Sequence, residues 1–335
     1  MRSRGAAFVL VVGLVVAATG CATAPPASIT VYSGRSEELI GPLIERFESE
    51  TGIQAQVRYG DTAELAALLL EEGGNTPADV YLAQDAGALG AVAGAGQLRA
   101  LPEDLLTPVP AALRSPAGQW VGISGRARVV VYDSRELGPE QLPTTIHGFT
   151  DPQWRGRLGW APTNGSFQAF VTAMRVLEGD EAARTWLEGI EANEPGSYEG
   201  NAQIVQAVAD GEIDAGFVNH YYLLRFLAEQ GDTFPVRNHF LSGSDSGALI
   251  NVAGAGILSS SDAEASARRF IEFLLHPDSQ RYFAQETFEY PLVAGIDGPT
   301  GAPPLDQIQT PAIDLSDLSD LQGTLSLLTE TGVLP

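Results

Sequence analysis

Short β-rich runs alternate with amphipathic helical segments along most of the chain, and this alternation constrains its fold more than any other feature. Residues 29–32 are β-rich, and the segment 36–51 that follows places its apolar side chains on one helical face, with Ser36 as the expected N-cap. A strand over 53–59, a helix over 62–72 and a strand over 80–83 continue the succession. This pace predicts an α/β fold whose mostly parallel sheets are connected by crossover helices.

The alternation resumes in the second half of the chain. Strands are expected over 129–132, 158–160, 213–218 and 253–258, and helices over 166–177, 180–191, 201–210, 221–230 and 263–275. Polar loops follow several of these strands, at 33–36, 84–85, 163–166 and 219–222. Open α/β sheets bind ligands beyond the carboxyl ends of their strands, and these loops come from both halves of the chain. We therefore predict two lobes with a ligand cleft between them, and a tail over 296–335 that packs on the surface.

The first 21 residues predict export and a lipid anchor. A basic start with two arginines precedes an apolar run over 6–18, which is too short to span a bilayer. The run ends in Ala-Thr-Gly-Cys, which resembles the cleavage box of bacterial lipoproteins. We expect a signal peptide over 1–20, a lipidated Cys21, a tether over 21–28 and an extracytoplasmic protein anchored to the membrane. The alternative is a cleaved secretory signal followed by an unmodified thiol.

The charge of the chain excludes some partners. The net charge is −23, and all 19 basic residues are arginines. Such a surface argues against nucleic acid or an anionic membrane as the main partner. It is compatible with a cationic cargo and equally with solubility in a salty medium. The single cysteine allows no internal disulfide, so packing has to hold the fold together.

A pair of adjacent tyrosines is the sharpest chemical feature. Tyr221 and Tyr222 follow Asn219 and His220 at an expected strand-to-helix turn, which brings two phenols near one point. Phenolate is a hard oxygen donor suited to a hard trivalent cation, and a bound metal would favour loss of protons whose pKa is ordinarily near 10. The alternative is a pair of ordinary packed aromatic residues. The ring of His220 is expected to point away from the phenols and to lie outside the first shell of ligands.

Candidate anion-binding groups occur elsewhere in the sequence. Arg35, Arg126 and Arg128 follow glycine-containing turns, and a guanidinium could hold a small oxyanion such as carbonate; salt bridges to carboxylates are the alternative. The turn 164–166, Asn164-Gly165-Ser166, opens an expected helix, whose backbone N–H groups favour an anion; simple N-capping is the alternative.

No common enzyme signature is present. The sequence contains no HExxH, CxxC pair, P-loop, GxGxxG or GxSxG motif, and its four histidines are scattered. We therefore expect a binding protein rather than an enzyme.

Six short segments occur in an order that resembles a known family. They are Ile29-Thr30-Val31-Tyr32-Ser33-Gly34-Arg35, Glu50-Thr51-Gly52-Ile53, Thr76-Pro77-Ala78-Asp79-Val80, Ser124 to Tyr132, Asn219-His220-Tyr221-Tyr222 and Glu289-Tyr290-Pro291-Leu292. Together they resemble the periplasmic ferric-iron-binding proteins of the FbpA type, which belong to the transferrin-like, type II periplasmic binding proteins. The resemblance covers residues 29–295.

The resemblance implies a two-lobed clamp that closes over Fe(III) and a synergistic anion, carbonate or phosphate. Tyr221 and Tyr222 match the tyrosine ligands of the family. Around the anion, the matching positions are Asn201, Asn219, the turn 164–166, Arg126 and Arg128, with Arg35, Ser36 and Gln84 as further candidates. The clamp implies a monomer that delivers iron to an ABC permease in the cytoplasmic membrane. We expect one lobe to comprise 29–126 plus 252–300, and the other 127–251 plus 301–335.

Two departures from the family pattern affect the expected ligand set. Ser36 stands where many members have a histidine ligand, and Gln84 stands where some have a glutamate ligand. A third tyrosine, Tyr32, Tyr59 or Tyr198, is an open candidate for a ligand. The alternative function is the same clamp holding an organic cation or a small oxyanion instead of iron.

Overall fold

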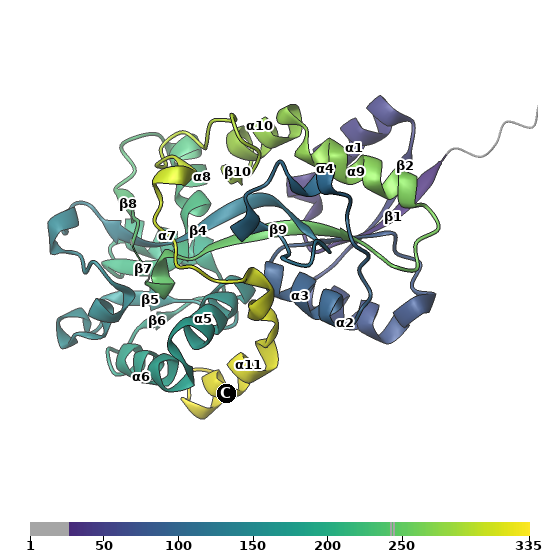
Figure 1. Cartoon of the computed structure of the whole chain (residues 1–335). Coiled ribbons are helices and arrows are strands. Elements are labelled where there is room, and N and C mark those ends of the chain that lie inside the picture. Colours follow the sequence, from purple (N-terminus) through teal and green to yellow (C-terminus); the bar gives the residue numbers. More distant parts are fainter. Residues whose placement is uncertain (1–26, 242, 244) are drawn as a thin grey trace, which may run out of the picture.

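Two lobes of mixed α/β structure make up the molecule, and two long strands run between them (Figure 1). The structure, a computed structural model, describes residues 27–241, 243 and 245–335. The two long strands are β4 (Val121–Asp133) and β9 (Ile250–Ile257). The prediction of a two-lobed α/β fold is confirmed. No helix in the described part of the chain is long and apolar enough to cross a membrane.

The first lobe contains β1 (Ser28–Ser33), β2 (Gln54–Tyr59), β3 (Val80–Ala83) and the short β10 (Tyr290–Pro291). Its strand order is β2-β1-β3-β9-β4, in which β1 is parallel to both neighbours and β9 is antiparallel to β3 and β4. Its helices are α1 (Glu37–Thr51), α2 (Thr62–Glu72), α3 (Ala86–Gly94), α4 (Glu103–Leu106), α9 (Glu264–Leu275) and α10 (Pro277–Gln285).

The second lobe continues from the far end of β4. There β4 pairs with β7 (Ala215–Asn219) and β8 (Val236–His239), while β5 (Leu158–Trp160) lies parallel to β7 and to β6 (Gly196–Ser197). Its helices are α5 (Gly165–Glu178), α6 (Asp180–Glu191), α7 (Asn201–Asp210) and α8 (His220–Gln230). Buried tryptophans anchor its core, where Trp186 contacts Phe217 edge-on at a centroid distance of 5.5 Å. Each aromatic side chain of this size buries a large apolar area, which stabilises such a core.

Strand β4 changes its partners near its middle. Ala127 is the last residue that pairs with β9, and Arg128 is the first that pairs with β7. The predicted lobe boundary between residues 126 and 127 lies beside this change and stays a prediction.

Most elements expected from the sequence are present, several with the same bounds, among them α2, α6 and α7. Pairing is mixed rather than mostly parallel, because β4 and β9 are antiparallel to every strand they contact in both sheets. Ser36 does occupy the N-cap of α1, but its side chain forms no capping hydrogen bond.

The C-terminal segment contacts both lobes, whereas the sequence predicted only surface packing. Leu315 and Leu318, in a 3-10 helix over Leu315–Ser319, are buried in the apolar cluster that includes Leu89 of α3. Leu327 and Leu328, in α11 (Leu321–Glu330), are buried in the core of the second lobe. Figure 1 shows this segment (yellow) descending between the lobes to α11 beside α5. Besides β4 and β9, the C-terminal segment is therefore a third part of the chain that connects the two lobes.

Glycines of α3 allow this segment to approach closely. A Cβ atom at Gly87 would lie 2.3 Å from the carbonyl oxygen of Leu318. We expect Gly87→Ala to displace the segment and to lower the free energy of unfolding by about 1–3 kcal/mol, as overpacking does. Gly94→Ala is the control, since a Cβ there meets nothing within 4 Å. Chemical denaturation of both variants checks this; equal stability would contradict it.

Candidate functional site

The two adjacent tyrosines lie where β7 passes into α8. Their rings stack at a centroid distance of 4.3 Å and an interplanar angle of 27°. Tyr221 is 3% exposed, while Tyr222 is half-buried. Within the described part of the chain, neither phenol oxygen forms a hydrogen bond. The expectation of two neighbouring phenols at a strand-to-helix turn is met by this geometry.

Buried arginines accompany the phenols. Burial and the neighbouring Tyr222 raise the pKa of Tyr221 well above 10, whereas the charges of Arg35 and Arg126 oppose this rise. Burial lowers the pKa of Arg128 to about 9, against the influence of Tyr222. Positive charge next to a phenol favours its ionised form, so these arginines reduce the cost of removing the phenol protons.

Arg126 and Arg128 retain unused hydrogen-bond donors. Arg128 donates one bond to the carbonyl oxygen of Phe217 (3.1 Å) and lies over the rings of Phe167 and Phe170. Arg126 donates to the carbonyl oxygen of Gln84. Among the described residues, Nε and Nη1 of both guanidinium groups are buried without a partner. Buried donors of this kind ordinarily have a partner, so an anion or water is expected here.

Arg35 forms a buried salt bridge, and its partner is Glu289. This partner was not identified from the sequence. Arg35 Nη2 donates to Glu289 Oε2 at 2.8 Å, and both side chains are almost fully buried. Ser124 and Thr287 donate to the same oxygen at 3.1 and 3.2 Å. Glu289 Oε1 lies 4.0 Å from Arg126 Nε. The salt bridge that the sequence left as an alternative for Arg35 is thus present, over a separation of 254 residues.

Four of the predicted polar residues form one network at the start of α5. Asn164 Oδ1 accepts hydrogen bonds from the backbone N–H of Ser166 (3.0 Å) and from its hydroxyl (2.6 Å), as an N-cap does. Asn201 Nδ2 donates to Asn164 and Ser166, and Asn201 Oδ1 accepts from the backbone N–H of Asn219 at 3.2 Å. The network connects the helix start to the residue before the tyrosine turn.

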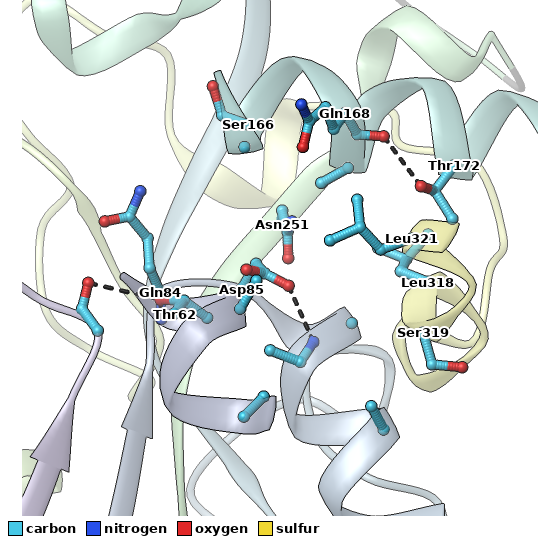
Figure 2. Close-up of a pocket in the computed structure, with 18 of the residues that line it drawn as sticks. Thr62, Gln84, Asp85, Ser166, Gln168, Thr172, Asn251, Leu318, Ser319 and Leu321 are labelled. Carbon is cyan, nitrogen blue, oxygen red and sulfur yellow. Dashed lines mark hydrogen bonds between the residues drawn. The ribbon is translucent and has the colours of Figure 1, made fainter. Parts of the chain in front are cut away.

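A cavity of about 490 Å³ separates the two lobes beside these groups (Figure 2). Predicted site residues in its wall are Gln84, Arg126, Arg128, Asn164, Gly165, Ser166 and Asn219. Its other walls are α2, α3, α5 and the C-terminal segment, which contributes Leu318, Leu321 and Leu325. Asp85 also faces the cavity, and burial raises the pKa of its carboxyl group. The cleft predicted from the polar loops is therefore present, and residues of both lobes line it.

Other predicted residues lie apart from this cavity. Ser36 is exposed at the start of α1. The hydroxyl of Tyr32 donates to Glu72 at 3.2 Å, and the ring of Tyr198 packs over Gly159 and Gly196. None of Tyr32, Tyr59 and Tyr198 is in the cavity wall. The wall does not include Tyr221, Tyr222, Arg35 or Asn201 either; Asn219, beside the tyrosine pair, is the part of that turn that lines it. Within the described residues, no group of three or more His, Cys, Asp or Glu side chains could hold a metal ion. Cys21 and the predicted signal peptide lie outside the described residues.

Comparison with known proteins places this chain in a family. The profile of the bacterial extracellular solute-binding proteins matches residues 64–307. The chain belongs to this family. It is 34% identical over 327 residues to the major ferric iron-binding protein of Neisseria meningitidis, covering 96% of this chain and 97% of that protein.

Two further similar proteins are also named for iron. The Fe(3+)-binding periplasmic protein of Serratia marcescens is 30% identical over 336 residues, which covers 100% of this chain and 99% of that protein. The solved structure of iron-bound HitA from Pseudomonas aeruginosa has a TM-score of 0.85 and 32% identity, and covers 92% and 100% of the two chains. The resemblance to ferric-iron-binding proteins that the sequence indicated is confirmed.

Proposed function

We propose that this solute-binding protein binds Fe(III) through Tyr221 and Tyr222, together with carbonate or phosphate, and delivers it to an ABC permease. Relatives of nearly full length that are named for ferric iron support the cargo. Two stacked phenols without hydrogen-bond partners in the described chain, next to buried arginines, are the observation on which the proposal rests. Iron(III) prefers such hard oxygen donors.

The anion would lie between the arginines and the start of α5. Arg126 and Arg128 offer buried N–H groups, and α5 begins at Gly165 in the cavity wall. The backbone N–H of Ser166 is already used by the side chain of Asn164. A helix start and guanidinium groups both favour an oxyanion. We also propose lipid anchoring at Cys21, an extracytoplasmic monomer and the lobe boundaries predicted from the sequence. Binding and release, rather than catalysis, would be its whole activity.

The visible spectrum tests the iron assignment. Ferric salt added to the metal-free protein with bicarbonate or phosphate should produce a red-brown phenolate-to-iron charge-transfer band that saturates at one iron per chain. Omitting the anion should weaken the band. Absence of a band under every anion condition would rule out the proposal.

A second candidate function is the binding of a small oxyanion or an organic cation without iron. The cavity volume of about 490 Å³ is in the range of small-molecule sites, and its buried arginine donors suit an oxyanion. Thermal shift measurements with a panel of such solutes distinguish the two functions, because a ligand that binds the folded state raises the melting temperature.

Proton release should accompany iron binding. The pKa of Tyr221 is above its ordinary value, so this phenol is protonated at neutral pH and has to lose its proton when it binds the metal. The affinity should therefore fall as the pH falls. We expect the wild type to release about one proton more per iron than Tyr221→Phe, measured in a pH-stat with the same ferric salt. Equal release by the two proteins would contradict this.

A further inference from the structure

The backbone of β4 is held by a side chain at the place where the strand passes from one lobe to the other. On one side of β4, pairing with β10 includes Ser124 and Gly125, and pairing with β7 begins at Arg128. Between them, the backbone N–H of Ala127 donates to Nδ1 of His220 at 3.2 Å. The imidazole thus takes the position of a missing strand partner, as buried N–H groups require.

His220 contacts both lobes. Its ring stacks on Tyr290 of β10 at a centroid distance of 4.6 Å and an angle of 22°, and the hydroxyl of Tyr290 donates to the carbonyl oxygen of Pro303 at 2.9 Å. On the side of the second lobe, Asn238 Nδ2 donates to the carbonyl oxygen of His220 at 3.0 Å. The sequence had left His220 as a peripheral neighbour of the tyrosines; the structure places its ring, fully buried, at the crossing point of the lobes.

The backbone that presents Tyr290 is strained. Phe288 has a φ angle of +57°, a left-handed conformation that a bulky residue rarely adopts. Such a conformation costs about 1–3 kcal/mol and persists when the surrounding contacts fix it. Here those contacts include the ion pair of Glu289 with Arg35 and the stacking of Tyr290 on His220.

The hydrogen bond from Ala127 fixes the tautomer of the imidazole. Because Nδ1 accepts the Ala127 hydrogen bond, the proton is carried by Nε2. Nε2 is buried and has no hydrogen-bond partner among the described residues.

We propose that His220 is a positioning residue, which fixes the hinge at Ala127 and thereby the place of Tyr221 and Tyr222 relative to the first lobe. The inference rests on the proposed iron-binding function. His220 is bonded directly to Tyr221, and the two rings meet edge-on at 6.0 Å. A looser crossing point would let the start of α8 move relative to Arg35 and Arg126 and would speed the loss of iron.

Two substitutions separate this role from simple packing. His220→Phe retains the stacked ring but leaves the Ala127 N–H without an acceptor. His220→Asn loses the ring but can accept the bond through its side-chain oxygen. We expect iron release to a competing chelator to be about tenfold or more faster in His220→Phe, in the range found for partners that orient metal ligands. His220→Asn should release iron more slowly than His220→Phe, although its larger loss of apolar volume makes it the less stable of the two.

Faster iron release from His220→Asn than from His220→Phe would overturn the inference. If iron release follows thermal stability, with His220→Phe close to the wild type, His220 only fills space. Should His220→Phe fail to fold, hydrogen exchange of the wild-type Ala127 amide replaces it, and fast exchange would exclude the hydrogen bond. A wild type without a charge-transfer band would contradict the proposed function itself. That result is distinct, because failure of the hinge role leaves the wild-type band intact.

Discussion

Tyr221→Phe and Tyr222→Phe are each expected to weaken iron binding by at least about 100-fold and to remove most of the charge-transfer band. Loss of a partner that only orients a ligand typically costs 10–100-fold, and these substitutions remove the proposed donor atom itself. The phenyl ring keeps the stacking of the pair, so the fold should be preserved. Competition with a ferric chelator gives the affinity, and visible absorption gives the band.

Tyr32→Phe is the matched control for these substitutions. Its hydroxyl already has a partner in Glu72, whereas the phenols of Tyr221 and Tyr222 have none among the described residues. The control should retain both affinity and band, and the same comparison extends to Tyr59 and Tyr198. Unchanged iron binding in both Tyr221→Phe and Tyr222→Phe would exclude the pair as the metal site.

Glu289→Gln is expected to lower the free energy of unfolding by about 3–5 kcal/mol. Removing one partner of a buried ion pair leaves the other charge without compensation, and Arg35 is only 2% exposed. Arg126 would lose its nearby carboxylate as well. Urea denaturation of the metal-free protein measures the loss. An anion bound among the freed arginines would restore part of it, so phosphate should stabilise this variant more than the wild type.

Glu50→Gln provides the corresponding change in an exposed ion pair. Arg46 Nε lies 3.0 Å from Glu50 Oε1 on the surface of α1. Exposed pairs contribute about 0–1 kcal/mol, so this variant should unfold nearly as the wild type does. Similar losses in the two variants would show that burial adds nothing to the Arg35–Glu289 interaction.

Local patterns in the sequence determined which parts of the fold could be predicted. The stripe of apolar residues in α1 and the β-rich run of β1 were recognisable because their periodicities differ. Helix α3 was missed, since a run of alanine and glycine has little amphipathic contrast. Helix α11 was missed for a different reason: the contacts that bury its leucines lie far away in the sequence.

In the candidate site, too, local features could be predicted and long-range contacts could not. Tyr221 and Tyr222 are neighbours in the sequence, and the turn that presents them could be predicted from the strand and helix on either side. Glu289 could not be connected with Arg35, because only the tertiary fold brings these residues together. The contacts of the His220 ring could not be predicted, since its direction depends on where β4 crosses between the lobes.

Strand β4 has a consequence for engineering this protein. Because the chain leaves the first lobe along β4 and returns to it along β9, a cut between these strands separates the N-terminal part of that lobe from β9, a strand in the middle of its sheet. A separately expressed half would display unpaired backbone amides and carbonyls and would tend to aggregate. Fluorescent reporters built from this scaffold are therefore better made by inserting a label into an exposed loop than by splitting the polypeptide.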